Sequence, residues 1–417
     1  MNAPHRRGAC PGLSAPMATG DGLLVRFLPT DGIALDAFIA LCAAAREHGN
    51  GIIEVTARGS LQVRGLSTRS ASAFARAVSA LEIAAADGVS VITDPLPDDP
   101  DVLVDAGGVA ATLRRAIGDA HLTLAPKISV LVDGGGRLHL DALAADVRLR
   151  AVGSREVPRF HVSVGGDAAS ATPLGSVSPR KAAEIVVLLL GVIASQGANM
   201  RAADVLRRCG TESFHAALDA DLERTPALPP RPPAEVIGRH SLRDGSIALG
   251  VALSFGHAHA DALSRLARFA AAHGARCVRL ALGRALLLLG LTHGAVRALA
   301  GEAEREGFIV GADDPRRRII ACPGKPACAS GLIAARALAS ELARHLPPLR
   351  DTVHISGCAK GCAHPAAAAL TVVGSERGCG IIQNGSARDV PQRYVPCGDM
   401  ISEVVRIAGE SREALHA

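Results

Sequence analysis

Four cysteines near the C-terminus have a spacing suited to an inorganic cofactor. Cys322 and Cys328 form a C-x5-C pair, and Cys358 and Cys362 form a C-x3-C pair after residues 329–357. An iron–sulfur cluster binds each corner through a separate thiolate, whereas a single zinc ion usually takes closely spaced C-x2-4-C ligands. The spacing favours a 4Fe–4S cluster, with a structural zinc site or unrelated thiols as the alternatives.

Both cysteine pairs lie in segments that contain glycine and proline. The first pair encloses Pro323-Gly324-Lys325-Pro326-Ala327, and the second encloses Ala359-Lys360-Gly361 directly after Gly357. Such residues let the backbone bend around a bulky group and bring amides near its sulfurs. We therefore expect a redox enzyme.

Composition limits the class of protein. The chain has 417 residues, of which 48% are hydrophobic and 20% charged, which predicts a globular protein of two or three domains. A net charge of +5, no tryptophan and one tyrosine argue against nucleic acid as a partner. The longest apolar stretch, Ile185–Ala194, is too short for a membrane span, and the N-terminus does not read as a secretory signal. We expect a cytoplasmic protein with no membrane partner.

Lysine is rare in this chain. Of 45 basic residues only four are lysine: Lys127, Lys181, Lys325 and Lys360. One interpretation is a genome that encodes most surface cations as arginine. The other is that lysines occupy places where a compact, mobile ammonium is needed, since two lie in the cysteine loops and a third follows Pro126.

An internal repeat runs through the chain. Residues 34–66 and 259–291 align without a gap, and both contain Asp-Ala, a leucine, His-Gly and a final Gly-Leu. The first copy predicts a strand, a helix, two strands and a helix, at Leu23–Leu28, Leu35–Glu47, Gly51–Thr56, Ser60–Arg64 and Ser70–Ile83. The sequence thus predicts a duplicated half of a ferredoxin-like α+β unit.

The remaining segments read as mixed helices and strands. Asp94–Asp101 reads as a loop, and Lys127–Leu140 as a hairpin that turns at Gly134-Gly135-Gly136. The prolines of Thr225–Glu235 predict a linker. We also expect strands at Phe160–Val164, Arg318–Ala321, Thr352–Ser356 and Leu370–Val373, and helices at Pro179–Gln196 and Ala329–His345.

Duplicated half-domains together with C-x5-C…C-x3-C resemble the sulfite/nitrite reductase superfamily, over about residues 16–410. Within it the chain is most similar to the precorrin-3B synthase family of aerobic cobalamin (vitamin B12) biosynthesis. The similarity rests on Pro16–Arg26, Thr56–Gln62, both cysteine loops and His364-Pro365.

The resemblance implies an α+β fold in which ferredoxin-like half-domains pack as a pseudo-twofold pair beside two reductase-type α+β domains, the second with the cluster. The expected limits are 16–88 and 238–311 for the half-domains, 89–224 and 312–417 for the α+β domains, and 225–237 for the linker.

Two departures from the reductase pattern point away from a small-anion site. Reductases of this superfamily present two basic residues beside the substrate in a strand similar to Pro-x-Lys-x-Lys. The matching segment here, Pro126-Lys127-Ile128-Ser129, has only one lysine. Ala359-Lys360 stands where reductases typically have Pro-Asn. A site for sulfite or nitrite needs crowded cations, so the loss of one suits a larger substrate.

The activity that the resemblance implies is a monooxygenase. Precorrin-3A, O2 and a reductant, NADH or a partner reductase, give precorrin-3B with a hydroxyl and a lactone. The implied cofactors are the 4Fe–4S cluster on Cys322, Cys328, Cys358 and Cys362 and a mononuclear non-haem iron. No G-x-G-x-x-G fingerprint opens a helix after a strand, so no nicotinamide site is visible.

A polycarboxylate substrate calls for a cationic cradle. Arg58 and Lys127 are the catalytic and substrate-binding candidates, Lys325 and Lys360 are further substrate-binding candidates, and Arg284 is a weaker addition. His364 is the candidate ligand of the second iron, with His161 and His139 behind it. Each could instead be an ordinary surface cation or a histidine bonded within its loop.

Two rival functions stay open. One is a sirohaem-dependent sulfite or nitrite reductase, and the other is a non-catalytic tetrapyrrole-binding or electron-transfer module. The six remaining cysteines lack paired spacing, and most of them read as ordinary buried thiols. Cys10 in the N-terminal loop and Cys379 near a glycine turn are the two for which another role stays open.

Overall fold

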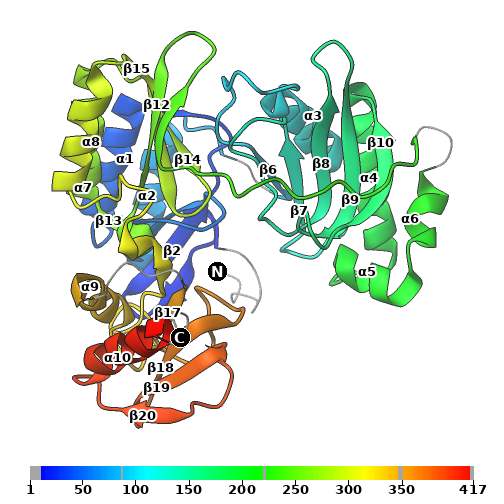
Figure 1. Ribbon diagram of the computed structural model, residues 1–417. Helices are drawn as coiled ribbons and strands as arrows, with labels where there is room; N and C mark the ends of the chain where they lie inside the picture. Colours follow the sequence, from blue (N-terminus) through cyan, green and yellow to red (C-terminus); the bar gives the residue numbers. More distant parts are fainter. Residues whose placement is uncertain (1–10, 86–87, 219–221, 346–350, 414–417) are drawn as a thin grey trace.

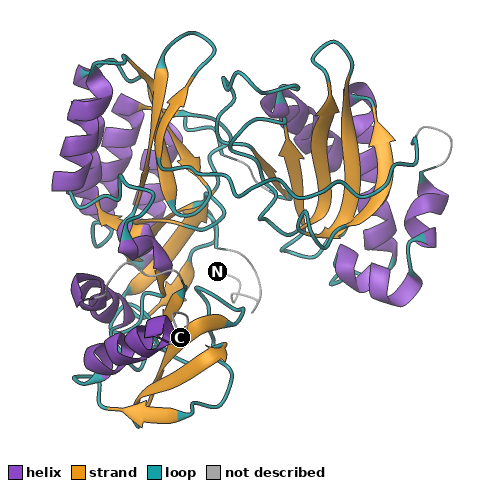
Figure 2. Ribbon diagram, in the orientation of Figure 1, coloured by secondary structure: helices purple, strands orange, loops and turns teal. Residues whose placement is uncertain are grey.

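The structure is a computed structural model that describes residues 11–85, 88–218, 222–345 and 351–413. Cys10 lies outside these ranges. The described residues form four five-stranded sheets. In Figure 1 the two sheets with β2 and β12 form one lobe, the sheet with β6–β10 a second, and the sheet with β17–β20 a third. Figure 2 shows helices packed against one face of each sheet.

The half-domains share secondary structure at corresponding positions. The first contains β1 Met17–Thr19, β2 Gly22–Phe27, β3 Ile33–Ala34, α1 Leu35–His48, β4 Ile52–Val55, β5 Leu61–Leu66 and α2 Thr68–Ala80. The second contains β11 Gly238–Ser241, β12 Ile247–Ala252, a 3-10 turn at Ser254–Gly256, β13 His257–His259, α7 Ala260–Ala272, β14 Cys277–Ala281, β15 Ala285–Leu291 and α8 Ala295–Arg305. This confirms the predicted duplication.

Each half-domain completes the sheet of the other. The strand orders are β1-β2-β5-β4-β13 and β11-β12-β15-β14-β3, so β3 and β13 change places. Ile33 pairs with Val278 of β14, and Ala258 pairs with Ile53 of β4. One hydrophobic core then contains residues of all four helices, including Leu41 of α1 and Leu266 of α7 at the repeated leucine position. The sequence pattern does not predict this exchange.

The two outer α+β units also repeat one another. The first runs β6 Ser90–Thr93, α3 Ala106–Asp119, β7 Ser129–Asp133, β8 Ala145–Gly153, β9 Pro158–Gly166, β10 Thr172–Val177, a 3-10 turn at Pro179–Lys181, α4 Ala182–Ser195, α5 Ala202–Cys209 and α6 Glu212–Ala217. The second runs η4 Pro315–Arg318, β16 Ile319–Ala321, α9 Ala335–His345, β17 Val353–Ser356, β18 Ala368–Ser375, β19 Gly378–Gly385, β20 Arg393–Val395 and α10 Met400–Glu413. In both, two parallel pairings are followed by two antiparallel ones.

Two predictions from the sequence are wrong. The expected hairpin over Lys127–Leu140 does not form, because β7 pairs in parallel with β6 and β8 and residues 134–144 are a loop. The helix expected from Ala329 begins at Ala335, because residues 329–334 pack against the cysteine loops. None of the described helices is long and apolar enough to cross a membrane.

The proline-rich segment is bonded along its length to the first α+β unit. Residues 224–237 contain no helix or strand. Arg231 pairs with Asp141 at 2.6 Å, and Pro229 O accepts from Arg150 at 2.9 Å. Burial tends to raise the pKa of Asp141, but the hydrogen bonds and charge of Arg231 have the larger effect and lower this pKa to about 2. The segment therefore connects the two halves without being free.

The loops after β6 and β7 of the first unit correspond to the cysteine loops of the second. In the first unit they contain Asp94, whose carboxylate accepts the Gly134 N–H at 2.9 Å in a buried setting. Burial raises the pKa of Asp94 to about 7, with a further contribution from Asp133, against the effect of the Gly134 N–H. Polar loops thus stand here in place of thiolates.

Asp94→Asn should change how stability depends on pH. The unfolded carboxyl ionises with its ordinary pKa of 3.8, while the folded one stays neutral up to about 7. Wild-type stability attributable to this group therefore falls as pH rises from about 4 to about 7. Urea unfolding at several pH values should show Asp94→Asn gaining stability relative to wild type across that window. A constant difference would contradict this ionisation.

Candidate cluster and substrate site

Parallel strand pairing brings the two cysteine pairs together. β16 and β17 are parallel neighbours, with Ala321 opposite Ile355. Cys322 directly follows β16 and Cys358 follows β17 after Gly357. Because parallel strands end at the same edge of a sheet, both loops begin side by side. Cys322, Cys328, Cys358 and Cys362 all line one cavity.

The thiols have the surroundings that an iron–sulfur cluster requires. The Gly357 N–H donates to Cys322 Sγ at 3.0 Å, a contact that tunes cluster thiolates. Burial raises the pKa of Cys362, the charges of Cys358, Cys322 and Cys328 raise it further, and Lys360 lowers it. The four sulfurs are therefore electrostatic neighbours at one cavity, and thiolates are the ligands that an iron–sulfur cluster takes.

Glycines allow the cysteine loops to pack backbone on backbone. A Cβ on Gly357 would lie 2.9 Å from Gly324 Cα, and one on Gly331 would lie 2.7 Å from Gly324 C. A Cβ on Gly374 of β18 would clash with Gly357 O. Contacts this short with rigid backbone exclude any side chain. Gly374 therefore supports the loop that presents an amide to Cys322.

The first half-domain holds the first cysteine loop. Arg64, a buried residue of β5, donates to Ala327 O at 2.5 Å and to both oxygens of Asp21 at 2.9–3.0 Å. A Cβ on Gly20 would lie 2.6 Å from Ala329 N. The β1–β2 turn is thus seated against the loop, and charge-assisted hydrogen bonds fix it there.

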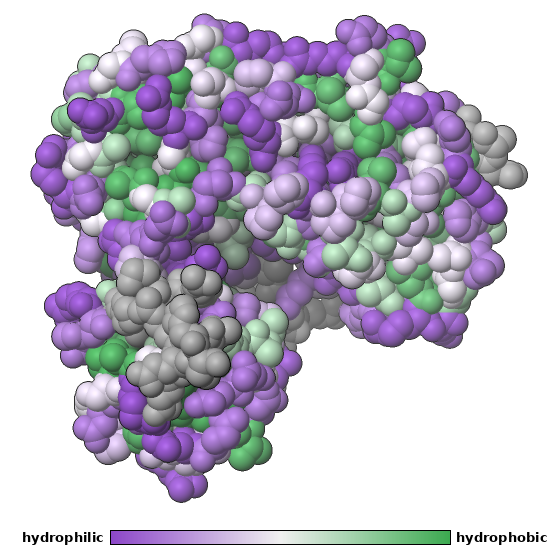
Figure 3. Space-filling view, viewed as in Figure 1, coloured by the Kyte–Doolittle hydropathy of each residue, from purple (hydrophilic) through white to green (hydrophobic). Residues whose placement is uncertain are grey.

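The cavity beside the cysteines has a volume of about 570 Å³ and is rich in cations. One carboxylate, Glu54, faces it together with Arg26, Arg58, Arg64, Arg284, Arg336 and Lys360. In Figure 3 the lobe that carries β17–β20 stands apart from the lobe of the first α+β unit, and the cavity is lined by the two half-domains and the unit with the cysteines. An excess of positive charge makes the cavity suitable for a molecule with several carboxylates.

A polar row crosses the first sheet on its cavity side. Arg26 lies opposite Gln62, and Gln62 lies opposite Glu54. With its amide turned, Gln62 donates to Glu54 at 2.7 Å and accepts from Arg26 Nε at 2.6 Å. Arg336 of α9 pairs with Glu54 at 2.7 Å. These residues were not predicted from the sequence, although polar side chains alternate there with the core residues Val25, Ile53, Leu61 and Val63.

The structure places the predicted cradle residues differently. Arg58 reaches the first α+β unit, donating to Ala144 O at 3.0 Å and to Ser129 Oγ at 3.3 Å. Lys360 lines the cavity and donates to Ser330 at 2.7 Å. Lys127 and Lys325 are exposed, and neither is among the described residues that line this cavity. Arg284 lines it and donates to the carbonyl oxygen of Ala363, the residue directly after Cys362, at 3.3 Å.

The candidate histidines bond mainly to backbone. His364 contacts Ala367 O at 3.3 Å, His139 contacts Pro232 O at 2.9 Å, and His161 contacts Pro226 O at 3.0 Å. His354 is buried beside His364, and their ring centroids lie 5.6 Å apart. Neither ring nitrogen of His354 has a hydrogen-bond partner. Among the described residues no three His, Cys, Asp or Glu side chains, the four cysteines included, are grouped to hold a single metal ion. The residues present therefore do not fit a complete mononuclear iron site.

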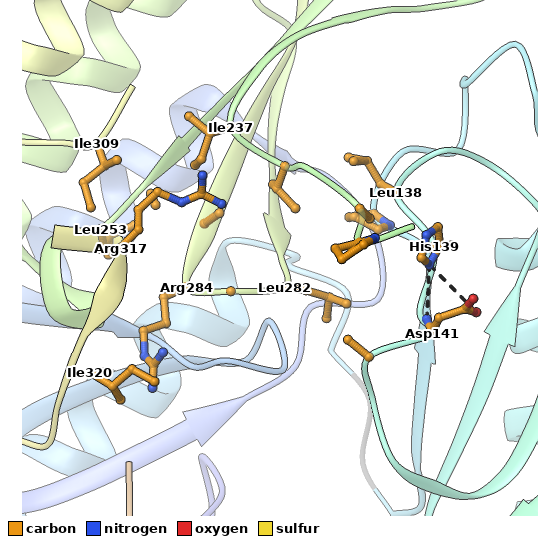
Figure 4. Close-up of a pocket in the computed structure, with 18 of the residues that line it drawn as sticks. Leu138, His139, Asp141, Ile237, Leu253, Leu282, Arg284, Ile309, Arg317 and Ile320 are labelled. Carbon is orange, nitrogen blue, oxygen red and sulfur yellow. Dashed lines mark hydrogen bonds and ion pairs between the residues drawn. The ribbon is translucent and has the colours of Figure 1, made fainter. Parts of the chain in front are cut away.

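A second cavity, of about 490 Å³, lies on the other side of Arg284 and Phe255, which border both. Figure 4 shows Leu138 and His139 of the first α+β unit on one side of this cavity and Leu282 and Arg284 of the second half-domain on the other, with the Asp141 N–H donating to His139 Nδ1. The neighbouring sheet face is apolar, because Leu287 and Leu289 stand at the positions that repeat Gln62 and Arg64. The corresponding sheet face is thus polar in the first half-domain and apolar in the second, while the second cavity itself still has charged residues such as Asp141, Arg231 and Arg317 in its lining.

Comparisons with known proteins agree with this architecture. The model of the nitrite/sulfite reductase ferredoxin-like half domain matches residues 15–81. A precorrin-3B synthase of Sinorhizobium sp. is 39% identical over 99% of this chain and 92% of its own length. A sulfite reductase (ferredoxin) of Synechococcus elongatus is 27% identical over 69% of this chain and 52% of its own.

Among solved structures, the Mycobacterium tuberculosis NirA protein superposes with a TM-score of 0.74. It covers 92% of this chain and 80% of its own at 20% identity, so it shows the shared fold alone. That fold confirms the α+β class expected from the sequence. The nitrite/sulfite reductase relatives also indicate an iron–sulfur cluster.

Gly374→Ala should weaken the seat of the cysteine loops. Its Cβ would clash with Gly357 O, so the loop must shift. We expect iron and acid-labile sulfide per chain to fall at least about twofold, with a stability loss of about 1–3 kcal/mol. Gly191→Ala in α4 is the matched control, since nothing lies within 4 Å of its Cβ. Equal cluster content in the two variants would contradict the packing argument.

Proposed function

The chain belongs to the precorrin-3B synthase family, and from that premise we propose that it converts precorrin-3A into precorrin-3B in aerobic cobalamin biosynthesis. The observation that carries the proposal is 39% identity to a precorrin-3B synthase over nearly the whole length of both chains. The cation-rich cavity beside four cysteines supports it, because the substrate is a polycarboxylate.

The proposed reaction is a balanced monooxygenation. One atom of O2 becomes a hydroxyl on one carbon of a macrocycle C=C bond, an acetate carboxyl group adds to the other carbon and closes as a lactone while that double bond is lost, and the second oxygen atom leaves as water. The reductant supplies two electrons, and two protons are taken up. We propose NADH as their source, reached through a partner reductase because the sequence has no dinucleotide fingerprint. We also propose that the protein is cytoplasmic.

Cys322, Cys328, Cys358 and Cys362 would hold the 4Fe–4S cluster. When bound, such a cluster passes single electrons to the neighbouring site. The protein's own part is to fix the loops through Gly357, Gly374 and Arg64 and to keep Cys322 buried. A second iron would need a ligand set that the described residues do not supply, so His364 is a candidate ligand without partners.

We propose that Arg26, Arg58, Arg284 and Lys360 bind and orient the substrate's carboxylates. Arg284 is the best placed of them, since it donates to the residue directly after Cys362 and borders both cavities. Burial and the charge of Arg336 lower its pKa, while Glu54 raises it. A buried guanidinium with several unused donors gains strongly from a carboxylate partner. Lys127 and Lys325 would act only at the rim.

The first test is spectroscopic. Anaerobically purified protein should show broad sulfide-to-iron absorption without sirohaem bands, and it should convert precorrin-3A only when O2 and a reductant are present. Sirohaem bands with six-electron reduction of sulfite or nitrite would replace the proposal by the reductase alternative. A reducible cluster without oxygen-dependent turnover would leave a binding or electron-transfer module.

Removing single cations should separate cradle from scaffold. Arg284→Gln should raise KM for precorrin-3A by about tenfold or more, the value of one charge-assisted hydrogen bond. Arg58→Ala should do the same and Lys127→Ala should have a smaller effect. Exposed Arg239→Gln is the control. Wild-type kinetics in all three variants, with iron content unchanged, would refute the cradle.

A further inference from the structure

Two cysteines outside the cysteine loops that contain Cys322, Cys328, Cys358 and Cys362 are in contact. Both are free thiols, and Cys379 Sγ donates to Cys397 Sγ at 3.4 Å. Strand pairing holds them there: Cys379 of β19 lies opposite Val395 of β20, and Cys397 follows Val395 by two residues. The pairing of β19 with β20 therefore fixes Cys379 and brings Cys397, in the turn that follows β20, next to it.

The two thiols differ in access. Cys379 is fully buried, whereas Cys397 is exposed. Burial, and then the hydrogen bond and charge of Cys397, raise the pKa of Cys379 to about 12. Cys379 is thus the protonated donor, and Cys397 is the sulfur that a reagent in solution meets first.

We propose that Cys379 and Cys397 form an intramolecular disulfide on exposure to low-molecular-weight disulfides such as oxidised glutathione. Cys397 thiolate attacks one sulfur of the reagent, the reagent's S–S bond breaks, and one reagent thiol leaves. Cys379 then loses its proton, attacks Cys397 Sγ and releases the second reagent thiol. Two electrons pass from the protein thiols to the reagent, and no other oxidant is needed.

The surroundings favour closure of the pair. Cys379 and Met400, the first residue of α10, belong to the same buried cluster as Cys322. Cys379 also lies opposite Gly374 of β18, which packs against Gly357. A bridge would therefore fasten the segment that leads into α10 to the sheet that supports the cluster loops.

The other cysteines that the structure describes outside the cysteine loops make no hydrogen bond to a second thiol. Cys42 is buried, and Cys209 contacts Gln196 Oε1 at 3.5 Å. In the described ranges, Cys379 and Cys397 make the one thiol–thiol hydrogen bond outside those loops. A disulfide here is a modification of the protein and is independent of the reaction proposed for the enzyme.

The test is peptide mapping of the cluster-loaded full chain. The protein is incubated under argon with oxidised glutathione, alkylated, and digested without reductant. We expect a linked peptide pair containing Cys379 and Cys397, lighter by two hydrogens, to become the main form of both residues. Dithiothreitol should reverse it, and iron content should stay unchanged. The raised pKa of Cys379 predicts slow closure.

Variants make the result decisive. Cys397→Ser should abolish the linked peptide and leave Cys379 unmodified, while Cys379→Ser should trap glutathione on Cys397. Cys209→Ser is the matched control and should keep the bridge. A lasting mixed disulfide on wild-type Cys397, no reaction at either residue, or a bridge that appears only after iron is lost would each overturn the proposal.

Discussion

The parallel pairing of β16 with β17 is the constraint on which the site depends. The proposed cluster needs four thiols from two loops to reach one group, and a parallel strand pair brings both loops to one edge of the sheet. Two further features hold the loops close together. Glycines let their backbones pack without intervening side chains, and Arg64 hydrogen-bonds the first loop to the first half-domain. A β17 slipped by one residue would turn Ile355 out of the core and move Cys358 away.

The cavity shows how a duplicated fold acquires one site. Both half-domain sheets have a second face turned away from the shared core. In the first copy Gln62, Glu54 and Arg64 make that face polar and cationic. In the second copy Leu287 and Leu289 join Leu96 and Leu138 in an apolar cluster that attaches the first α+β unit. A few substitutions at strand positions thus make one face polar and cationic and let the other pack against the first α+β unit.

The features that could be predicted from the sequence are those encoded within one segment of the chain. The repeat, the cysteine loops and the class of fold could be read from spacing and alternation, because these patterns reflect periodicity within one segment. The exchange of β3 and β13 could not, since each is short and its partner lies in the other copy. Lys127–Leu140 suggested a hairpin because Asp133-Gly134-Gly135-Gly136 is a turn sequence, yet the parallel pairing of β7 decided its course. Arg284 was underrated because only the fold brings it to Ala363. The domain limits and the roles of the site residues stay proposals.

The exchanged strands have a consequence for synthesis on the ribosome. When the first half-domain emerges, the edge of β4 has no neighbour, and its partner, His257–His259, is still to be translated. An unpaired strand edge invites association with other chains. The nascent chain must therefore carry an open sheet through translation of the whole first α+β unit, and the N-terminal half depends on its own C-terminal half to close it.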